Sequence, residues 1–172
     1  MSNLWPCRGI VPTIHDTAFI APGAQIIGDV HVGAQASIWF NCVVRGDVDS
    51  VRIGARTNLQ DGSIVHVTGG HFSTSIGDDV LIGHQCVIHG CRLENQSFVG
   101  MGSTVMDGCV IEQGAMLGAG SLLSPGKVIK ANQLWLGRPA RFVRNLTPEE
   151  REQNRAGVIH YVELAAEYLA HR

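Results

Sequence analysis

Aliphatic residues recur at every sixth position along most of this chain, and this repeat limits the possible fold more than any other feature. The first series is Ile20, Ile26, Val32, Ile38 and Val44, and after three additional residues it resumes with Ile53, Leu59 and Val65. After five additional residues it resumes with Ile76, Ile82 and Ile88, and after the loss of one residue it runs through Leu93, Val99, Val105, Ile111, Leu117 and Leu123. Neither an α-helix nor a coiled coil has a period of six residues, so the repeat indicates another regular structure.

A period of six residues predicts a coil with three flat faces. Each face consists of one short strand and one turn, its aliphatic residue points inward, and the small residue that often follows lets the chain bend at the corner. About 18 residues then complete one coil, and successive coils stack like parallel strands about 4.8 Å apart. We therefore expect an all-β domain over residues 1–145, a parallel β-helix of hexapeptide repeats.

From residue 146 the six-residue period gives way to the signals of an α-helix. Thr147 is a candidate N-cap, Pro148 follows it in the first turn, and Glu150 completes a capping box. We expect a helix of roughly 20 residues within 146–172, packed on the coil of its own chain or of a neighbour. Its apolar stripe consists of Val158, Val162, Ala165 and Leu169.

The composition argues against several broad functions. The 172 residues include 13 Lys+Arg and 15 Asp+Glu, a balance without the basic surface that nucleic-acid binding needs. No apolar run approaches the roughly 18 residues of a membrane span, and no leader pattern is present, so neither membrane insertion nor export is expected. The five cysteines form no CxxC pair, which favours free thiols in a cytoplasmic protein.

The phase of the repeat predicts which polar residues share a face. Arg45, His66 and His89 each follow the inward aliphatic residue of the same face on successive coils, so they form one column. Asp61 and His84 each lie two positions after the aliphatic residue of the preceding face, and they form a second column. Because zinc accepts neutral imidazole nitrogens, two histidines one coil apart can share a metal ion.

His84 points away from the other two histidines within one chain. A catalytic zinc site needs three protein ligands and one open position. If three coils pack around a threefold axis, His84 of a neighbouring chain can reach the pair formed by His66 and His89, and cyclic trimers are an ordinary symmetry. For Arg45 and Asp47 two interpretations stay open: an ordinary ion pair linking coils or subunits, or a pair that shapes the site.

Three motifs carry a resemblance to a known family: VVRGDV at 43–48, TNLQDGSIVH at 57–66 and IGHQCVIHG at 82–90. Through them, nearly the whole chain resembles the γ-class carbonic anhydrases. The resemblance implies left-handed coiling of the β-helix, an exception to the usual right-handed crossover. It also implies a homotrimer that binds Zn²⁺, or Fe²⁺ or Co²⁺, through His66, His84 and His89, one of them supplied by an adjacent subunit.

The activity that the resemblance implies is the reversible hydration of carbon dioxide to bicarbonate. The metal would lower the pKa of a water molecule toward 7. Gln60 would orient that water or the substrate, while Arg45 with Asp47 and Asp61 would hold the subunit boundary and the metal ligands. The other residues carried over from the family are Asn58 and Tyr161.

Two departures from the family pattern predict slow hydration. Val48 follows the RGD motif where the best-studied members carry an acidic residue. The loop TGGHFSTS (68–75) holds no acidic residue, where those members have a proton-shuttling glutamate. His71 is the only titratable group of this loop, and it is a candidate shuttle because an unperturbed imidazole titrates near 6.5.

Three other functions stay open at the level of sequence. A hexapeptide acyltransferase would share the coil and use one histidine at a subunit boundary, without needing three metal ligands. A related acyl-CoA thioesterase would keep the metal ligands, and the sequence separates it poorly from a carbonic anhydrase. The third alternative is a non-catalytic binding protein.

Overall fold

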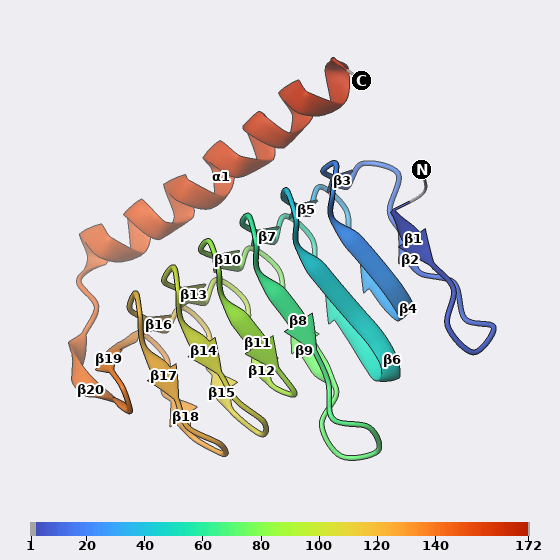
Figure 1. The fold of residues 1–172 in the computed structure, drawn as a ribbon. Helices are drawn as coiled ribbons and strands as arrows, with labels where there is room; N and C mark the ends of the chain where they lie inside the picture. The colour runs from blue at the N-terminus through green and yellow to red at the C-terminus, as the bar shows by residue number, and fades with distance from the viewer. Residues whose placement is uncertain (1–2, 172) are drawn as a thin grey trace.

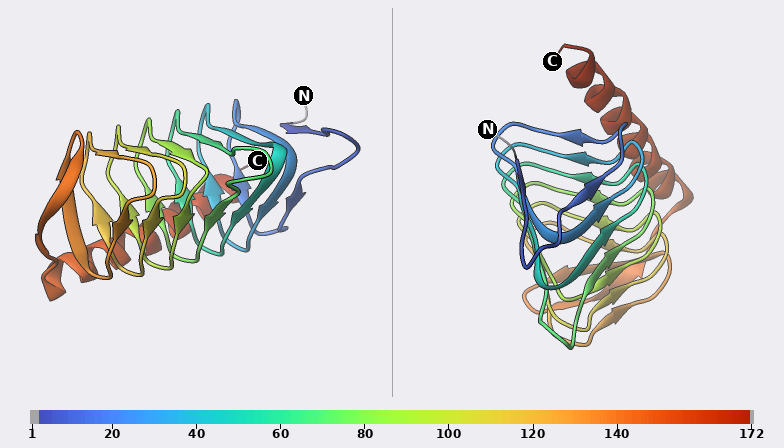
Figure 2. Two further views of the ribbon diagram at one scale, coloured as in Figure 1. Left: turned by 90° about the horizontal axis from the view of Figure 1, so that it is seen from below. Right: turned by 90° about the vertical axis from the view of Figure 1, so that its right-hand side faces the viewer.

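The computed structural model describes residues 3–171 and shows a coil of short parallel strands with one long helix, α1, along its side (Figure 1). Viewed along its axis, the coil has a triangular outline (Figure 2). The all-β coil and the C-terminal helix expected from the sequence are therefore confirmed.

Each of the three faces is a stack of parallel strands. The first face holds β8 (Ile64–His66), β11 (Val87–His89), β14 (Thr104–Val105) and β17 (Leu122–Leu123). The second holds β2 (Thr13–Ile14), β9 (Thr74–Ile76), β12 (Arg92–Leu93), β15 (Val110–Ile111) and β18 (Val128–Ile129). The third holds β3 (Phe19–Ile20), β5 (Ser37–Ile38), β7 (Asn58–Leu59), β10 (Leu81–Ile82), β13 (Phe98–Val99), β16 (Met116–Leu117) and β19 (Gln133–Gly137).

Four further features complete the coil. The long strands β4 (Gln25–Val32) and β6 (Val43–Ile53) run from the first face into the second, and the three additional residues of the repeat lie within β6. Strand β1 (Leu4–Trp5) pairs with the start of β4, and β20 (Ala140–Asn145) pairs antiparallel with β19 at the other end. The five additional residues form a loop between β8 and β9, closed by a bridge between Thr68 and Phe72.

The register of the strands confirms the predicted phase of the repeat. Val65 pairs with Val44 on one side and with Ile88 on the other, and Ile88 pairs with Val105. All four side chains are fully buried inside the coil. The burial of one aliphatic side chain per face and coil contributes about 1.5–3 kcal/mol each, and this sum holds the coils together.

Corners of the coil lie three residues after inward aliphatic residues such as Ile53, Ile76 and Leu93. Arg56, Asp79 and Gln96 occupy one such column, with φ of 57°, 58° and 61°. The glycine directly after the aliphatic residue, such as Gly83, serves another purpose: a Cβ there would lie 2.6 Å from the backbone nitrogen of Met101 on the next coil. The expectation that this small residue makes the bend is wrong, because its role is to let coils stack closely.

Helix α1 (Pro148–Ala170) begins with the expected capping box, in which Thr147 and Glu150 bond to each other's backbone nitrogens. It covers the third face, where it contacts β3, β5, β7 and β10. Val158 and Ala165 of the predicted stripe are buried, and Leu169 packs on a cluster with Phe19 and Trp39. Within residues 3–171, no helix is long and apolar enough to cross a membrane.

The five cysteines are free thiols, as predicted, and four of them are buried. Burial raises the pKa of the Cys42 thiol to about 11, which keeps it protonated at neutral pH. These residues serve as small apolar side chains of the core.

Candidate metal centre

His66 and His89 lie next to each other on the first face of the coil. Strands β8 and β11 pair in parallel, and their register places His66 directly opposite His89. The Nδ1 atom of His66 and the Nε2 atom of His89 are 3.0 Å apart. The two histidines of the predicted column are thus brought together, with one nitrogen of each ring facing the other.

The second ring nitrogen of His66 contacts a carboxylate. Its Nε2 atom lies 3.0 Å from Oδ1 of Asp47, and the other oxygen of Asp47 accepts a hydrogen bond of 2.5 Å from Arg45. Burial raises the pKa of the Asp47 carboxyl, but the hydrogen bonds from Arg45 and His66 outweigh it and lower the pKa below its ordinary value. Arg45 and Asp47 therefore form an ion pair that also holds one of the candidate ligands.

His89 has a corresponding partner that the sequence analysis missed. Its Nδ1 atom lies 2.6 Å from Oδ1 of Asp107, and Oδ2 of Asp107 accepts a hydrogen bond of 2.8 Å from Thr68. Asp107 follows the inward Val105 by two positions on the same face, one coil beyond His89. The repeat phase places Met106 in the next position of the histidine column, so phase alone did not single out Asp107, which lies one residue further along.

His84 lies apart from the other two histidines within the chain. It follows β10 at the end of the third face, and its Nδ1 atom lies 2.9 Å from Oδ2 of Asp61, which confirms the second column. Both side chains are more than two-fifths exposed. Across residues 3–171, no three His, Cys, Asp or Glu side chains come close enough together to hold a metal ion.

The remaining candidate residues lie near the second column or beneath α1. Tyr161 packs edge-on against Trp39, and burial together with the charge of Asp61 raises the pKa of its phenol. Gln60 is buried next to Asp61 in the chain. Asn58 is buried on the third face and donates a 2.9 Å hydrogen bond to Ser37, so it is not brought together with His66 and His89.

The comparisons with known proteins identify the family. A protein from Methanocaldococcus jannaschii named "Probable carbonic anhydrase" is 56% identical over 146 residues, which cover 85% of this chain and 91% of that protein. A carbonic anhydrase of Geobacillus kaustophilus is 44% identical over 97% of this chain and 91% of its own length. Gamma carbonic anhydrase 1 of Arabidopsis thaliana mitochondria is 45% identical over 92% of this chain. This chain belongs to the γ-class carbonic anhydrase family.

The γ-class chain spans about 57–62% of the length of the three Arabidopsis relatives. Two hexapeptide families also match it: the bacterial transferase hexapeptide over residues 12–46 and the hexapeptide repeat of succinyl-transferase over residues 73–107. A crystal structure of a hexapeptide transferase family protein from Anaplasma phagocytophilum is 49% identical, with a TM-score of 0.92, and covers 96% of this chain and 97% of that chain. A Bacillus cereus structure with a provisional acetyltransferase name is 42% identical, with a TM-score of 0.97, over 99% of this chain and 100% of its own.

The donor set of this γ-class member fits a divalent metal. Two nitrogens bound tetrahedrally to zinc at about 2.0–2.1 Å lie about 3.4 Å apart, close to the 3.0 Å between His66 and His89. Each of these rings also has a carboxylate on its other nitrogen, Asp47 for His66 and Asp107 for His89. Metal-binding histidines almost always have such a partner there, which is a carboxylate, a backbone carbonyl or a water.

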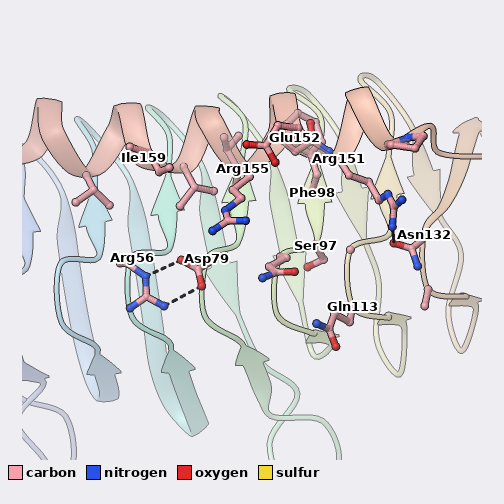
Figure 3. Close-up of a pocket in the computed structure, with 18 of the residues that line it drawn as sticks. Arg56, Asp79, Ser97, Phe98, Gln113, Asn132, Arg151, Glu152, Arg155 and Ile159 are labelled. Atoms are coloured by element: carbon pink, nitrogen blue, oxygen red, sulfur yellow. Dashed lines mark hydrogen bonds and ion pairs between the residues drawn. The ribbon is translucent and has the colours of Figure 1, made fainter.

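A groove between α1 and the coil lies elsewhere on the molecule (Figure 3). Its volume is about 910 Å³, and its walls include the ion pair of Arg56 with Asp79 and the helix residues Arg151 and Arg155. None of the three candidate histidines lines this groove. The cavity and the candidate metal centre are therefore separate features.

Proposed function

We propose that this chain catalyses the reversible hydration of carbon dioxide to bicarbonate, with a metal ion held by three histidines at the boundary between two subunits of a homotrimer. His66 and His89 of one subunit and His84 of its neighbour would be the ligands, and Zn²⁺ the metal, with Fe²⁺ or Co²⁺ as substitutes. The observation that carries the proposal is the facing pair of imidazole nitrogens 3.0 Å apart, with a carboxylate behind each ring.

The outer surface of the first face supports a neighbouring subunit at this position. Val43, Ile64 and Val87 pair in register next to the histidine column, and all three side chains point outward. Ile64 is 45% exposed, and Val43 and Val87 are half-buried. Helix α1 packs on the third face, and a second copy of the chain would bury this apolar column on the first face.

The same arrangement accounts for the position of His84. With its Asp61 partner it lies at the exposed edge that ends the third face, where a side chain can reach a neighbour. Nδ1 of His84 lies 2.9 Å from the Asp61 carboxylate, which leaves Nε2 to serve as a ligand. The threefold arrangement joins this edge of one subunit to the first face of the next.

The residues around the metal would bind, orient and exchange protons. When bound, the metal supplies the Lewis acidity that brings the pKa of water toward 7. Asp47 accepts from Nε2 of His66 and so keeps the Nδ1 lone pair directed toward His89. Gln60 orients the water or carbon dioxide, and Tyr161 lies on the Asp61 side of the subunit boundary.

Proton export limits the rate in this proposal. Val48 is exposed where an acidic residue would accept a proton, and the loop 68–75 carries no carboxylate. His71, exposed in that loop, is the candidate to relay a proton in place of a carboxylate. We therefore propose a slow carbonic anhydrase, in the cytoplasm, where free thiols such as these five persist.

Acyl transfer or acyl-CoA hydrolysis is the second candidate function. It is favoured by the transferase names of two solved structures that are 49% and 42% identical to this chain. A non-catalytic binding role is the third.

One comparison separates the candidates. Hydration of carbon dioxide, followed by stopped flow, and turnover of acetyl-CoA would be measured on the same zinc-loaded sample. His66→Ala serves as the inactive variant, and His160→Ala, on the exposed side of α1, as the matched control. Hydration that disappears in His66→Ala and persists in His160→Ala supports the proposal. Turnover of acetyl-CoA without hydration would favour acyl chemistry instead. If the sample shows neither activity, the non-catalytic binding role remains.

A further inference from the structure

We propose that Asp107, held by Thr68, is a positioning residue that directs His89 toward the metal. This inference rests on the proposed function, because it concerns a ligand of the same site. It adds a residue that the family motifs at 43–48, 57–66 and 82–90 do not contain.

The first step is the direction of the hydrogen bond between Asp107 and His89. The Asp107 carboxylate lies 2.6 Å from Nδ1 of His89. An ionised carboxylate has no proton to donate, so the Nδ1 atom must carry the hydrogen. A neutral imidazole protonated at Nδ1 presents its lone pair at Nε2, and Nε2 is the atom that faces His66. The contact therefore sets both the tautomer of His89 and the direction of its ring.

The second step is the position of the carboxylate itself. Thr68 donates to Oδ2 of Asp107 at 2.8 Å, so both oxygens have fixed partners and the group cannot turn away from His89. Thr68 begins the loop between β8 and β9, and a backbone bridge to Phe72 holds it. At the end of the same loop, Thr74 donates a 2.6 Å hydrogen bond to the carbonyl of His66. The loop is thereby tied to both candidate ligands of the first face.

The third step is a comparison with an ordinary aspartate of the repeat. Asp78 also lies two positions after an inward aliphatic residue, Ile76, and its carboxylate accepts from the backbone nitrogen of Ala55 on the neighbouring coil. Asp107 makes no such backbone bond within the part of the chain that the structure describes; its partners are the side chains of His89 and Thr68. A carboxylate that caps a corner stabilises the coil, whereas this one orients a histidine.

The experiment compares four variants of the full chain: Asp107→Ala, Asp107→Asn, Thr68→Val and the matched control Asp78→Asn. Zinc affinity is measured by competition with a chromophoric chelator, and the orientation of the His89 ring by crystal structures of the metal-free protein. We expect Asp107→Ala to weaken zinc binding about 10–100-fold, the range found for partners of metal ligands. Asp107→Asn should lose less, because an amide oxygen still accepts from Nδ1, and Thr68→Val should fall between wild type and Asp107→Ala. Asp78→Asn should bind zinc like wild type.

The two readouts separate this inference from the proposed function. If the wild-type chain binds no zinc, the proposed function fails, but the ring orientation still tests the role of Asp107. The inference then requires that the His89 ring leaves its place opposite His66 in Asp107→Ala. An unchanged ring in Asp107→Ala overturns the inference. So does a variant that melts at a lower temperature but retains wild-type zinc affinity, because Asp107 would then only stabilise the coil.

Discussion

The close stacking of the coils at Gly83 leads to a quantitative prediction for Gly83→Ala. The added Cβ would lie 2.6 Å from the nitrogen, 2.8 Å from Cα and 3.1 Å from Cβ of Met101. These are backbone atoms or atoms rigidly attached to the backbone of the next coil, and they cannot rotate away. Overpacking typically costs about 1–3 kcal/mol, and a backbone contact belongs at the upper end of that range, about 3 kcal/mol.

A second glycine provides the control for this experiment. Gly120 has φ of +67°, and a Cβ added there would meet no atom within 4 Å, so Gly120→Ala tests backbone strain without a steric contact. That strain costs about 1–2 kcal/mol for a residue with a Cβ. The free energy of unfolding would be measured by urea titration with circular dichroism, on metal-free protein at one fixed concentration. Gly83→Ala should also weaken zinc binding, because His84 is the next residue along the chain.

The comparison between the two glycines can refute the reasoning. If Gly83→Ala loses no more stability than Gly120→Ala, the glycine after the aliphatic residue is not there for close stacking. Equal loss of stability would indicate that Gly83 is needed for the bend of the chain instead, although its φ is not positive.

Two further predictions concern the C-terminal helix and the proton path. Hydrogen bonds from Arg144 and from the backbone of Thr147 lower the pKa of Glu150 to about 2. The stability that this group adds is therefore present above its unfolded pKa of about 4.3 and is lost as the pH falls toward 2. Urea titrations should therefore show Glu150→Gln less stable than wild type at pH 7 and the difference shrinking below pH 4.5, whereas a difference independent of pH would contradict it. His71→Ala should slow hydration in dilute buffer by about 100-fold and recover with added imidazole buffer, because general acid–base groups contribute about 10²–10⁴-fold. An unchanged rate and buffer dependence in stopped flow would exclude His71 as the shuttle.

The phase of the repeat explains why so much of the fold was predictable. One aliphatic residue per face must be buried, so the count from Val44 to Val65 to Ile88 determines which residues share a face. The column of His66 and His89 and the separate position of His84 follow from that count. The capping box at Thr147 was also predictable, because it depends only on local spacing.

Other features depend on contacts that spacing does not encode. The partner of His89 was missed because the repeat phase puts Met106, and not Asp107, in the next position of the histidine column. Asn58 was carried over from the family, whereas its place beside the inward Leu59 on the face under α1 buries it away from the histidines. The role of Gly83 depends on the distance to the next coil, which no single repeat contains.

The most direct test of the account is a mixed trimer made from two inactive chains. His66→Ala and His84→Ala would be co-expressed with different affinity tags, and trimers carrying both tags would be purified. Each mixed trimer should contain one complete site, with His84 from one chain and His66 and His89 from the other, so it should bind about one third of the wild-type zinc and regain hydration. Trimers of either variant alone should lack both. A mixed trimer without zinc or activity would contradict the account, because the three histidines would then have to act within one chain or not at all.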